Sequence, residues 1–150
     1  MTKLIAVAAL FVAFILIVPA NARDDGSEPS EGEITEYAFN YMKTLSGQKL
    51  SDREIASQLA SAIFWSEKMQ LVCPMYFNVN ARRARFDYLL RQGTWQMMFG
   101  VGKTATSILN EAVTKRNGEY NNSVSKKEWC EGVKAFGIKV FSWGPLFEQD

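Results

Sequence analysis

The chain has 150 residues, of which 17 are basic and 16 are acidic, and it contains no histidine. A chain so close to electroneutrality has no long-range field that would hold nucleic acid or an anionic membrane, so we expect neither as a partner. The absence of histidine excludes Ser-His and Cys-His nucleophile pairs, and it also excludes zinc sites that contain histidine.

Residues 1–22 follow the pattern of a secretory signal peptide. A short basic start precedes an apolar run over residues 4–18, and Pro19 and the small residues Ala20 and Ala22 come next. The apolar run is shorter than the roughly 18 residues that a membrane-spanning helix needs, and its flank matches a cleavage site instead. We therefore predict cleavage after Ala22 and a periplasmic or secreted mature protein.

The next segment, residues 23–30, is polar and acidic and contains Gly26 and Pro29. It has little apolar surface to bury, so we interpret it as a flexible leader. We expect residues 31–150 to form a single helical domain.

Two helices are predicted in the first half of this domain, each opened by a Ser-x-x-Glu capping box. Ser30 begins the first helix, which we expect to end at Gly47, and Ser51 begins the second. The second helix has an unusually wide apolar face, which predicts contacts on two sides. It should stop near Cys73, because proline at position 74 cannot continue a helix interior.

Three more helices are predicted in the second half. A third helix should begin at Asn78 or Asn80 and stop before Gly93, and a fourth should run from a Thr94 cap to residues 117–118. A third capping box, at Ser125, begins the last helix. The apolar segment after this helix is expected to fold back on the core.

Two cysteines occupy positions that two docked helices would bring together. Cys73 lies at the end of the second predicted helix, and Cys130 lies in the first turn of the last. An even cysteine count in an exported protein indicates a disulfide, although the sequence leaves open whether it joins one chain or two. The fold class we predict is all-α, a compact array of about five helices with one disulfide.

Four aromatic residues in the connector and the tail indicate a partner surface. Aromatic side chains in such places are either lids on the core or anchors of an interface. Our first hypothesis is a non-enzymatic protein that binds another protein or peptide through an apolar, aromatic surface. The candidate residues are Tyr76, Phe77, Trp143 and Phe147.

A second hypothesis is calcium binding, because residues 117–128 resemble an EF-hand loop. Asn122 replaces the glycine of the sharp turn, and only two of the expected ligands are charged, which predicts low affinity. The shared Ser-x-x-Glu ending is equally explained by a helix cap. The expected ligands are Asn117, Glu119, Asn121, Ser125 and Glu128. No other cofactor is expected.

Three remaining patterns carry weaker functional interpretations. A hydrolase that uses carboxylates would need two acids to converge, but the spacing of Glu67, Asp87 and Glu111 places no two on one face. Residues 100–104 resemble the end of a phosphate-binding loop, but Met97 stands where its first glycine should be, and we place the segment inside a helix. Four arginines make the third helix basic, and we interpret them as a solvated face: Arg82, Arg83, Arg85 and Arg91.

Overall fold

The structure is a computed structural model that describes residues 26–100 and 102–148, and all regular elements within these ranges are helical. The predicted signal peptide lies outside the described residues. No helix in the described ranges is both long enough and apolar enough to cross a membrane. The elements are α2 (Glu31–Leu45), α3 (Asp52–Leu71), the 3₁₀ turn η1 (Cys73–Met75), α4 (Ala81–Phe99), α5 (Lys103–Asn121), α6 (Lys126–Val140) and the 3₁₀ turn η2 (Gly144–Phe147).

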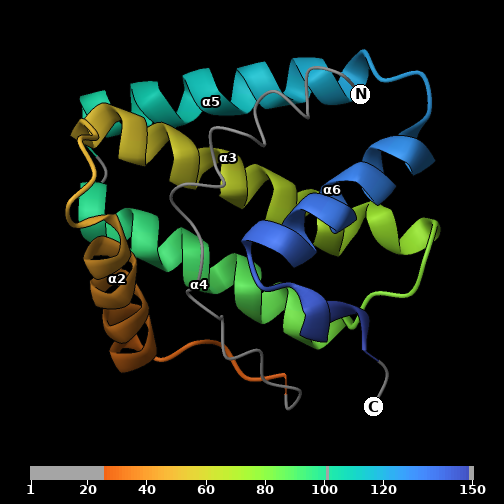
Figure 1. Cartoon of the computed structure of the whole chain (residues 1–150), viewed down its shortest axis with the longest axis horizontal. Helices are drawn as coiled ribbons and strands as arrows, with labels where there is room; N and C mark the ends of the chain where they lie inside the picture. The colour runs from red at the N-terminus through yellow and green to blue at the C-terminus, as the bar shows by residue number, and fades with distance from the viewer. Residues whose placement is uncertain (1–25, 101, 149–150) are drawn as a thin grey trace.

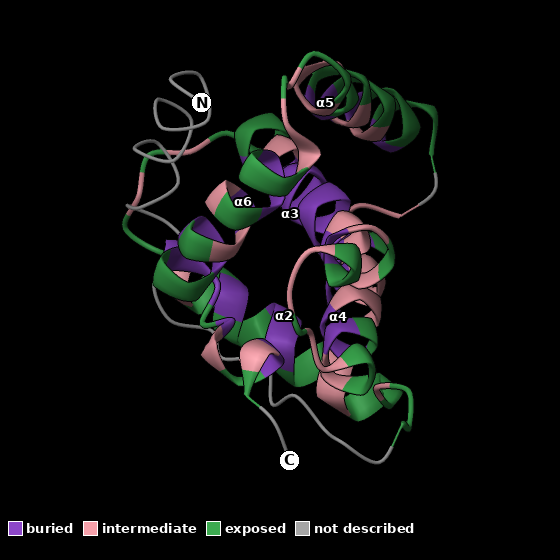
Figure 2. Ribbon diagram, turned by 90° about the vertical axis from the view of Figure 1, so that its right-hand side faces the viewer, coloured by how far each residue is buried: buried purple, intermediate pink, exposed green. Residues whose placement is uncertain are grey.

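Helix α3 is the central element of the fold. It runs between α4 and α5, as Figure 1 shows, while α2 packs on α4 and α6 covers the far end of α3. One side of α3 contributes Phe64 and Trp65 to the main core, and the other contributes Leu59 and Ala60 to a smaller cluster with α5. The prediction that this helix contacts neighbours on two sides is confirmed. Figure 2 shows the buried segments of α2, α3, α4 and α6 turned toward the middle of the molecule.

The helix starts predicted at Ser30, Ser51 and Ser125 are confirmed in atomic detail. Ser30 and Ser51 each form a capping box, in which the serine Oγ accepts from the glutamate N–H three residues on and the glutamate carboxylate accepts from the serine N–H. Ser125 is the N-cap of α6, and its Oγ accepts from Glu128 N at 3.2 Å. Each such cap satisfies backbone donors that would otherwise lack a partner in the first turn.

The predicted boundary between the third and fourth helices is wrong. Gly93 and Thr94 lie inside α4, which continues to Phe99 and ends at Gly100 with a φ of +70°. Gly93 packs closely on α2, because a Cβ there would lie 2.7 Å from Ile34 Cδ1 and would require that side chain to shift. Thr94 is compatible with a helix interior because its buried Oγ1 donates to Leu90 O at 2.7 Å.

Two further boundaries move for related reasons. Residues 100–104, which we had placed inside a helix, instead span the end of α4 and the start of α5. Helix α5 then passes through Gly118 and ends at Asn121. In its last turn, the Tyr120 carbonyl accepts hydrogen bonds from Lys126 Nζ and Ser123 Oγ. A glycine alone therefore did not end this helix; the bonds to its last carbonyls did.

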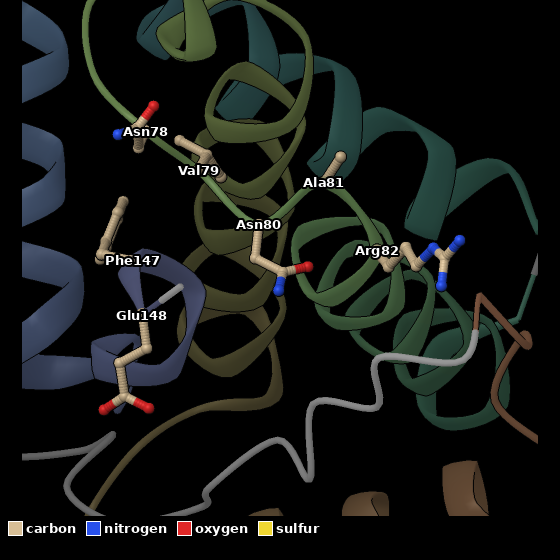
Figure 3. Close-up of a pocket in the computed structure, with 7 residues that line it drawn as sticks. All are labelled: Asn78, Val79, Asn80, Ala81, Arg82, Phe147 and Glu148. Atoms are coloured by element: carbon tan, nitrogen blue, oxygen red, sulfur yellow. The ribbon is translucent and has the colours of Figure 1, made fainter. Parts of the chain in front are cut away.

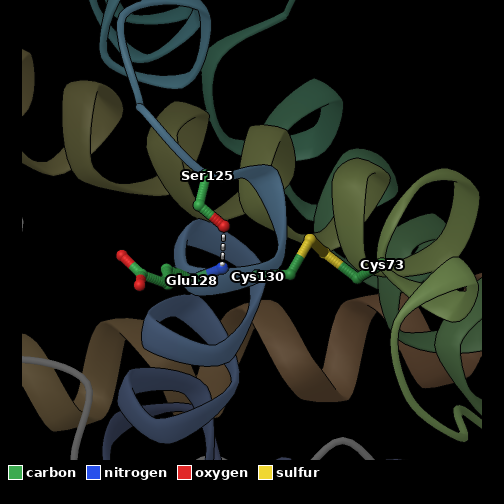
Figure 4. The surroundings of a disulfide bond; sticks show 4 residues. All are labelled: Cys73, Ser125, Glu128 and Cys130. Atoms are coloured by element: carbon green, nitrogen blue, oxygen red, sulfur yellow. Dashed lines mark hydrogen bonds between the residues drawn. A yellow bond between two sulfur atoms is a disulfide. The ribbon is translucent and has the colours of Figure 1, made fainter.

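The predicted disulfide joins Cys73 and Cys130 within one chain. It links η1, at the end of α3, to the first turns of α6, as Figure 4 shows, and the two Cα atoms are 5.5 Å apart. Both cysteines are fully buried. Because the bond spans a sequence separation of 57 residues, the chain-entropy model assigns it about 4 kcal/mol of stabilisation.

The tail folds back on the core, as predicted. Ser142 has a φ of +56°, and this turn reverses the chain after α6. Trp143 is then fully buried, with its ring lying against Gly137 of α6. This reversal of the chain places η2 beside the start of α4, and residues near both elements line the candidate site.

Gly137 offers a test of this packing, because a Cβ there would lie 1.9 Å from Trp143 Cε3. We expect Gly137→Ala to lower the free energy of unfolding by about 1–3 kcal/mol, the usual cost of overpacking a core. Gly118→Ala is the matched control, because a Cβ at Gly118 meets no atom within 4 Å and alanine favours the helix by up to about 1 kcal/mol. Urea unfolding measures both, and equal stability of the two variants would contradict the packing described here.

Candidate functional site: an aromatic groove beside the start of α4

An open groove of about 430 Å³ lies where the chain enters α4 and η2 crosses it. Figure 3 shows Phe147 and Glu148 on one side, Arg82 on the other, and the backbone of residues 78–81 between them. Asn80 caps α4, and its Oδ1 accepts from Arg83 N at 3.2 Å. The groove therefore combines an apolar ring, one basic and one acidic side chain, and the positive end of a helix.

Phe147 is the aromatic residue that lines this groove, and its ring packs against the ring of Phe77 beside the groove. Phe77 and Phe147 pack edge to face, with ring centroids 5.9 Å apart. Lys134 of α6 places its Nζ 4.8 Å from the Phe77 centroid and 4.6 Å from the Phe147 centroid. Both rings are half-buried, so each packs on the core while presenting a face to solvent.

The other two residues of the predicted partner surface have different positions. Tyr76 caps η1 and is half-buried against the core. Trp143 is fully buried, so its assignment to a partner surface is wrong. Its indole is taken inward because Nε1 donates to a buried carboxylate and the ring fills the space above Gly137.

The groove is held in shape by hydrogen bonds between η2 and α4. Asn80 N donates to Leu146 O at 2.7 Å, and Arg83 Nη1 donates to Pro145 O at 2.9 Å. Arg83 Nη1 also lies 3.9 Å from Glu148 Oε2. These bonds join backbone segments that are more than 60 residues apart in the sequence, so the two sides of the groove move together.

Behind the groove, the buried carboxylate of Asp87 joins three parts of the chain. Its Oδ2 accepts from Arg91 Nε at 3.0 Å, from Ser66 Oγ at 3.1 Å and from Trp143 Nε1 at 3.1 Å. Its Oδ1 accepts from Arg91 Nη2 at 3.2 Å. Helix α3, helix α4 and the tail thus meet on one charged group, and Trp143 directly precedes η2.

Arg91 is the counter-charge of Asp87, and it lies in the core rather than on a solvated face as predicted. Its guanidinium stacks on Phe141 at 4.7 Å from the ring centroid, and its exposed fraction is 1%. Burial lowers the pKa of this guanidinium, but the charge and hydrogen bonds of Asp87, together with the Tyr37 and Tyr41 phenols, outweigh this effect and raise the pKa overall. Arg91 therefore stays charged. Burial also raises the pKa of the neighbouring Tyr37 and Tyr41 phenols.

A second buried arginine repeats this arrangement on the other side of α3. Arg116 Nε donates to Ser61 Oγ at 3.0 Å, and its Nη1 lies 3.1 Å from both carboxylate oxygens of Glu119. Its guanidinium lies 4.9 Å from the ring centroid of Trp65. In both networks a serine buried in α3 takes part: Ser66 donates to the Asp87 carboxylate, whereas Ser61 accepts from Arg116.

Sequence reasoning missed both networks, although a signal for the first was present. Asp87 and Arg91 follow Ala84 at positions i+3 and i+7, so the two polar residues occupy the buried stripe of α4. Ser66 likewise follows Ile63 on the buried stripe of α3. Polar residues at inward positions with helical spacing predict a buried pair, whereas we had counted Arg91 with the solvated arginines.

The five residues of the predicted calcium loop do not surround a common point. Asn117, Glu119 and Asn121 lie within α5, and the Glu119 carboxylate is bound to Arg116. Ser125 caps α6, with its Oγ bonded to the N–H of Glu128. No cluster of three or more histidine, cysteine or acidic side chains suited to a metal occurs in the described part of the chain.

An ammonium group takes the position that a cation would need in this turn. Lys126 Nζ donates to the carbonyls of Tyr120, Asn121 and Ser123, and to Ser123 Oγ at 3.0 Å. It also lies 4.7 Å from the ring centroid of Tyr120. A second cation beside this fixed charge would be repelled, so the geometry disfavours calcium here.

Two of the three acids considered for hydrolysis, Asp87 and Glu111, are engaged on different parts of the molecule. Asp87 is buried against Arg91, whereas Glu111 forms an exposed ion pair with Arg53 of α3. The segment 100–104 follows helix α4, not the strand that a phosphate-binding loop requires.

The chain matches no protein-family model, no curated protein and no solved structure.

The buried ion pair can be tested with a double-mutant cycle of Asp87→Asn and Arg91→Met. Each single change leaves an uncompensated group in the core, so we expect each to cost about 3–5 kcal/mol of unfolding free energy. The double variant should lose less than the sum, because neither charge then remains buried. The exposed pair provides the control: Glu111→Gln should cost less than about 1 kcal/mol. Urea unfolding gives all four values, and a cost for Asp87→Asn no larger than for Glu111→Gln would refute the argument.

The turn between α5 and α6 is tested by thermal melts with calcium and with chelator. We expect calcium to leave the melting midpoint of the natural protein unchanged, because the carbonyl oxygens already accept hydrogen bonds from the Lys126 ammonium group. Lys126→Gln should lower stability by about 1–2 kcal/mol through loss of charged hydrogen bonds, whereas Lys127→Gln, at the exposed neighbouring position, should not. A midpoint that rises with calcium in the natural protein would instead establish the loop as a metal site.

Proposed function

We propose that this is an exported, non-enzymatic protein that binds a segment of another protein or peptide in the groove between η2 and α4. One observation carries the proposal: Phe77 and Phe147 form a half-buried aromatic pair, with Lys134 over both rings, at the side of an open groove. The export part of the proposal rests on the signal-peptide pattern of residues 1–22 and on the disulfide.

The rigidity of the groove supports a role in binding. Phe77 closely follows the disulfide-linked η1, and Phe147 ends the turn that Trp143 and Arg83 hold in place. Aromatic side chains that are already ordered lose little conformational entropy when a partner docks on them. Aromatic anchors at the centre of an interface commonly supply most of its binding free energy.

The proposal can be tested by site-specific photo-crosslinking in the exporting cell. We expect a benzophenone amino acid at position 147 or 77 to give a discrete covalent adduct that mass spectrometry identifies. The matched control is position 39, because Phe39 is 69% exposed and lies on α2, away from the groove. Adducts at none of these positions, or equal adducts at all three, would refute the groove as the binding site.

Binding to the identified partner should then depend on the aromatic pair. Phe147→Ala is expected to weaken binding by about tenfold, equivalent to about 1.4 kcal/mol, while Phe39→Ala leaves it unchanged. Circular dichroism melts of both variants check that the groove variant is folded under the conditions of the binding measurement.

A further inference from the structure

The first turns of α4 carry an unusual concentration of positive charge. Arg82, Arg83 and Arg85 occupy its N-terminal part, and the first turn contains no acidic residue. By contrast, the first turns of α2, α3 and α6 all contain glutamate. Since the N-terminus of a helix already carries partial positive charge, arginines there add to the local potential instead of offsetting it. Such an arrangement favours an anionic partner over a neutral one.

Two of these arginines face solvent, and both lie against the chain's own acidic leader. Arg85 Nη2 contacts Glu28 Oε1 at 3.0 Å, in a pair where both side chains are more than half exposed. A Cβ on Gly26 would lie 3.8 Å from Arg82 Cδ and Nε, so the leader backbone passes beside Arg82. Arg83 differs, because it is directed toward Pro145 O and Glu148 at η2.

We propose that the segment held in the groove is acidic, with carboxylates that bind Arg82 and Arg85 and an apolar side chain that packs on Phe147. This inference rests on the proposed function and specifies the chemistry of its partner. The chain itself supplies an example of the ligand, since residues 24–29 read Asp-Asp-Gly-Ser-Glu-Pro and Glu28 already occupies Arg85. The leader is thus an internal competitor for the arginine face of α4.

The leader is weakly held, so a partner can displace it. An ion pair between two exposed side chains is screened by water and salt and shifts an equilibrium by only a few-fold. A partner that adds an apolar contact to Phe147 gains an interaction that the leader lacks in its Gly-Ser segment. A peptide suits this surface better than a nucleic acid, because the chain as a whole is nearly neutral and the basic face is one helix turn long.

The test is fluorescence anisotropy with the exported protein and a labelled peptide, Asp-Asp-Gly-Leu-Glu-Pro, which keeps the acidic spacing of the leader and adds one apolar residue. Its neutral twin is Asn-Asn-Gly-Leu-Gln-Pro. We expect the acidic peptide to bind about tenfold more tightly than the twin at low salt, and to lose this advantage in R82Q/R85Q. Glu28→Gln should tighten binding by about twofold to fivefold, the range expected for release of an exposed ion pair. Arg53→Gln, at an exposed arginine of α3, should match the natural protein.

The outcomes separate this inference from the proposed function. If R82Q/R85Q binds the acidic peptide as tightly as Arg53→Gln does, or if the neutral twin binds equally well, the acidic partner is refuted. Groove binding still stands in that case, provided that Phe147→Ala weakens both peptides. Tighter binding of a single-stranded oligonucleotide of equal charge would also overturn the inference, because the arginine face would then select phosphate rather than an acidic peptide.

Discussion

The carboxylate of Asp87 is the interaction on which the arrangement of this protein depends. It is fully buried and accepts hydrogen bonds from α3, from α4 and from the tail that follows α6. A charge in that position is tolerated only because Arg91 lies beside it and each of its oxygens accepts at least one hydrogen bond. Any other relative placement of these three segments would leave a charged group in the core without its partners.

Replacing such a network by apolar residues often leaves stability unchanged or improves it, so stability alone does not explain it. The network instead determines where Trp143 and the η2 turn lie. Trp143 fills the space over Gly137 while its indole N–H donates to Asp87. That placement directs η2 across the start of α4, where Asn80 and Arg83 bind its carbonyls. The buried ion pair is therefore connected to the surface groove through Trp143 and η2.

The disulfide constrains the C-terminal end of α3 and also helps to position the residues beside this groove. Cys73 begins η1, and the connector that leads from it carries Phe77 to the ring of Phe147. Lys134 of α6 lies over both rings because Cys130, one turn earlier, is bonded to Cys73. The two aromatic residues, 70 positions apart in the sequence, are brought together by one covalent bond and one buried charge.

The sequence by itself determined the features that depend on near neighbours in the chain. Serine caps, a proline stop and helical apolar spacing act within a few residues, so the helical class and the helix starts at residues 30, 51 and 125 were predicted correctly. The cysteine pair was also predicted, since two cysteines allow only one pairing within a chain. Only the tertiary structure decided whether Gly93 ends a helix or lies inside one, packed against Ile34. It likewise decided whether Arg91 is exposed to water or buried beside Asp87. It also decided that Trp143 is buried while Phe147 remains at the surface, because these outcomes depend on which distant surfaces meet.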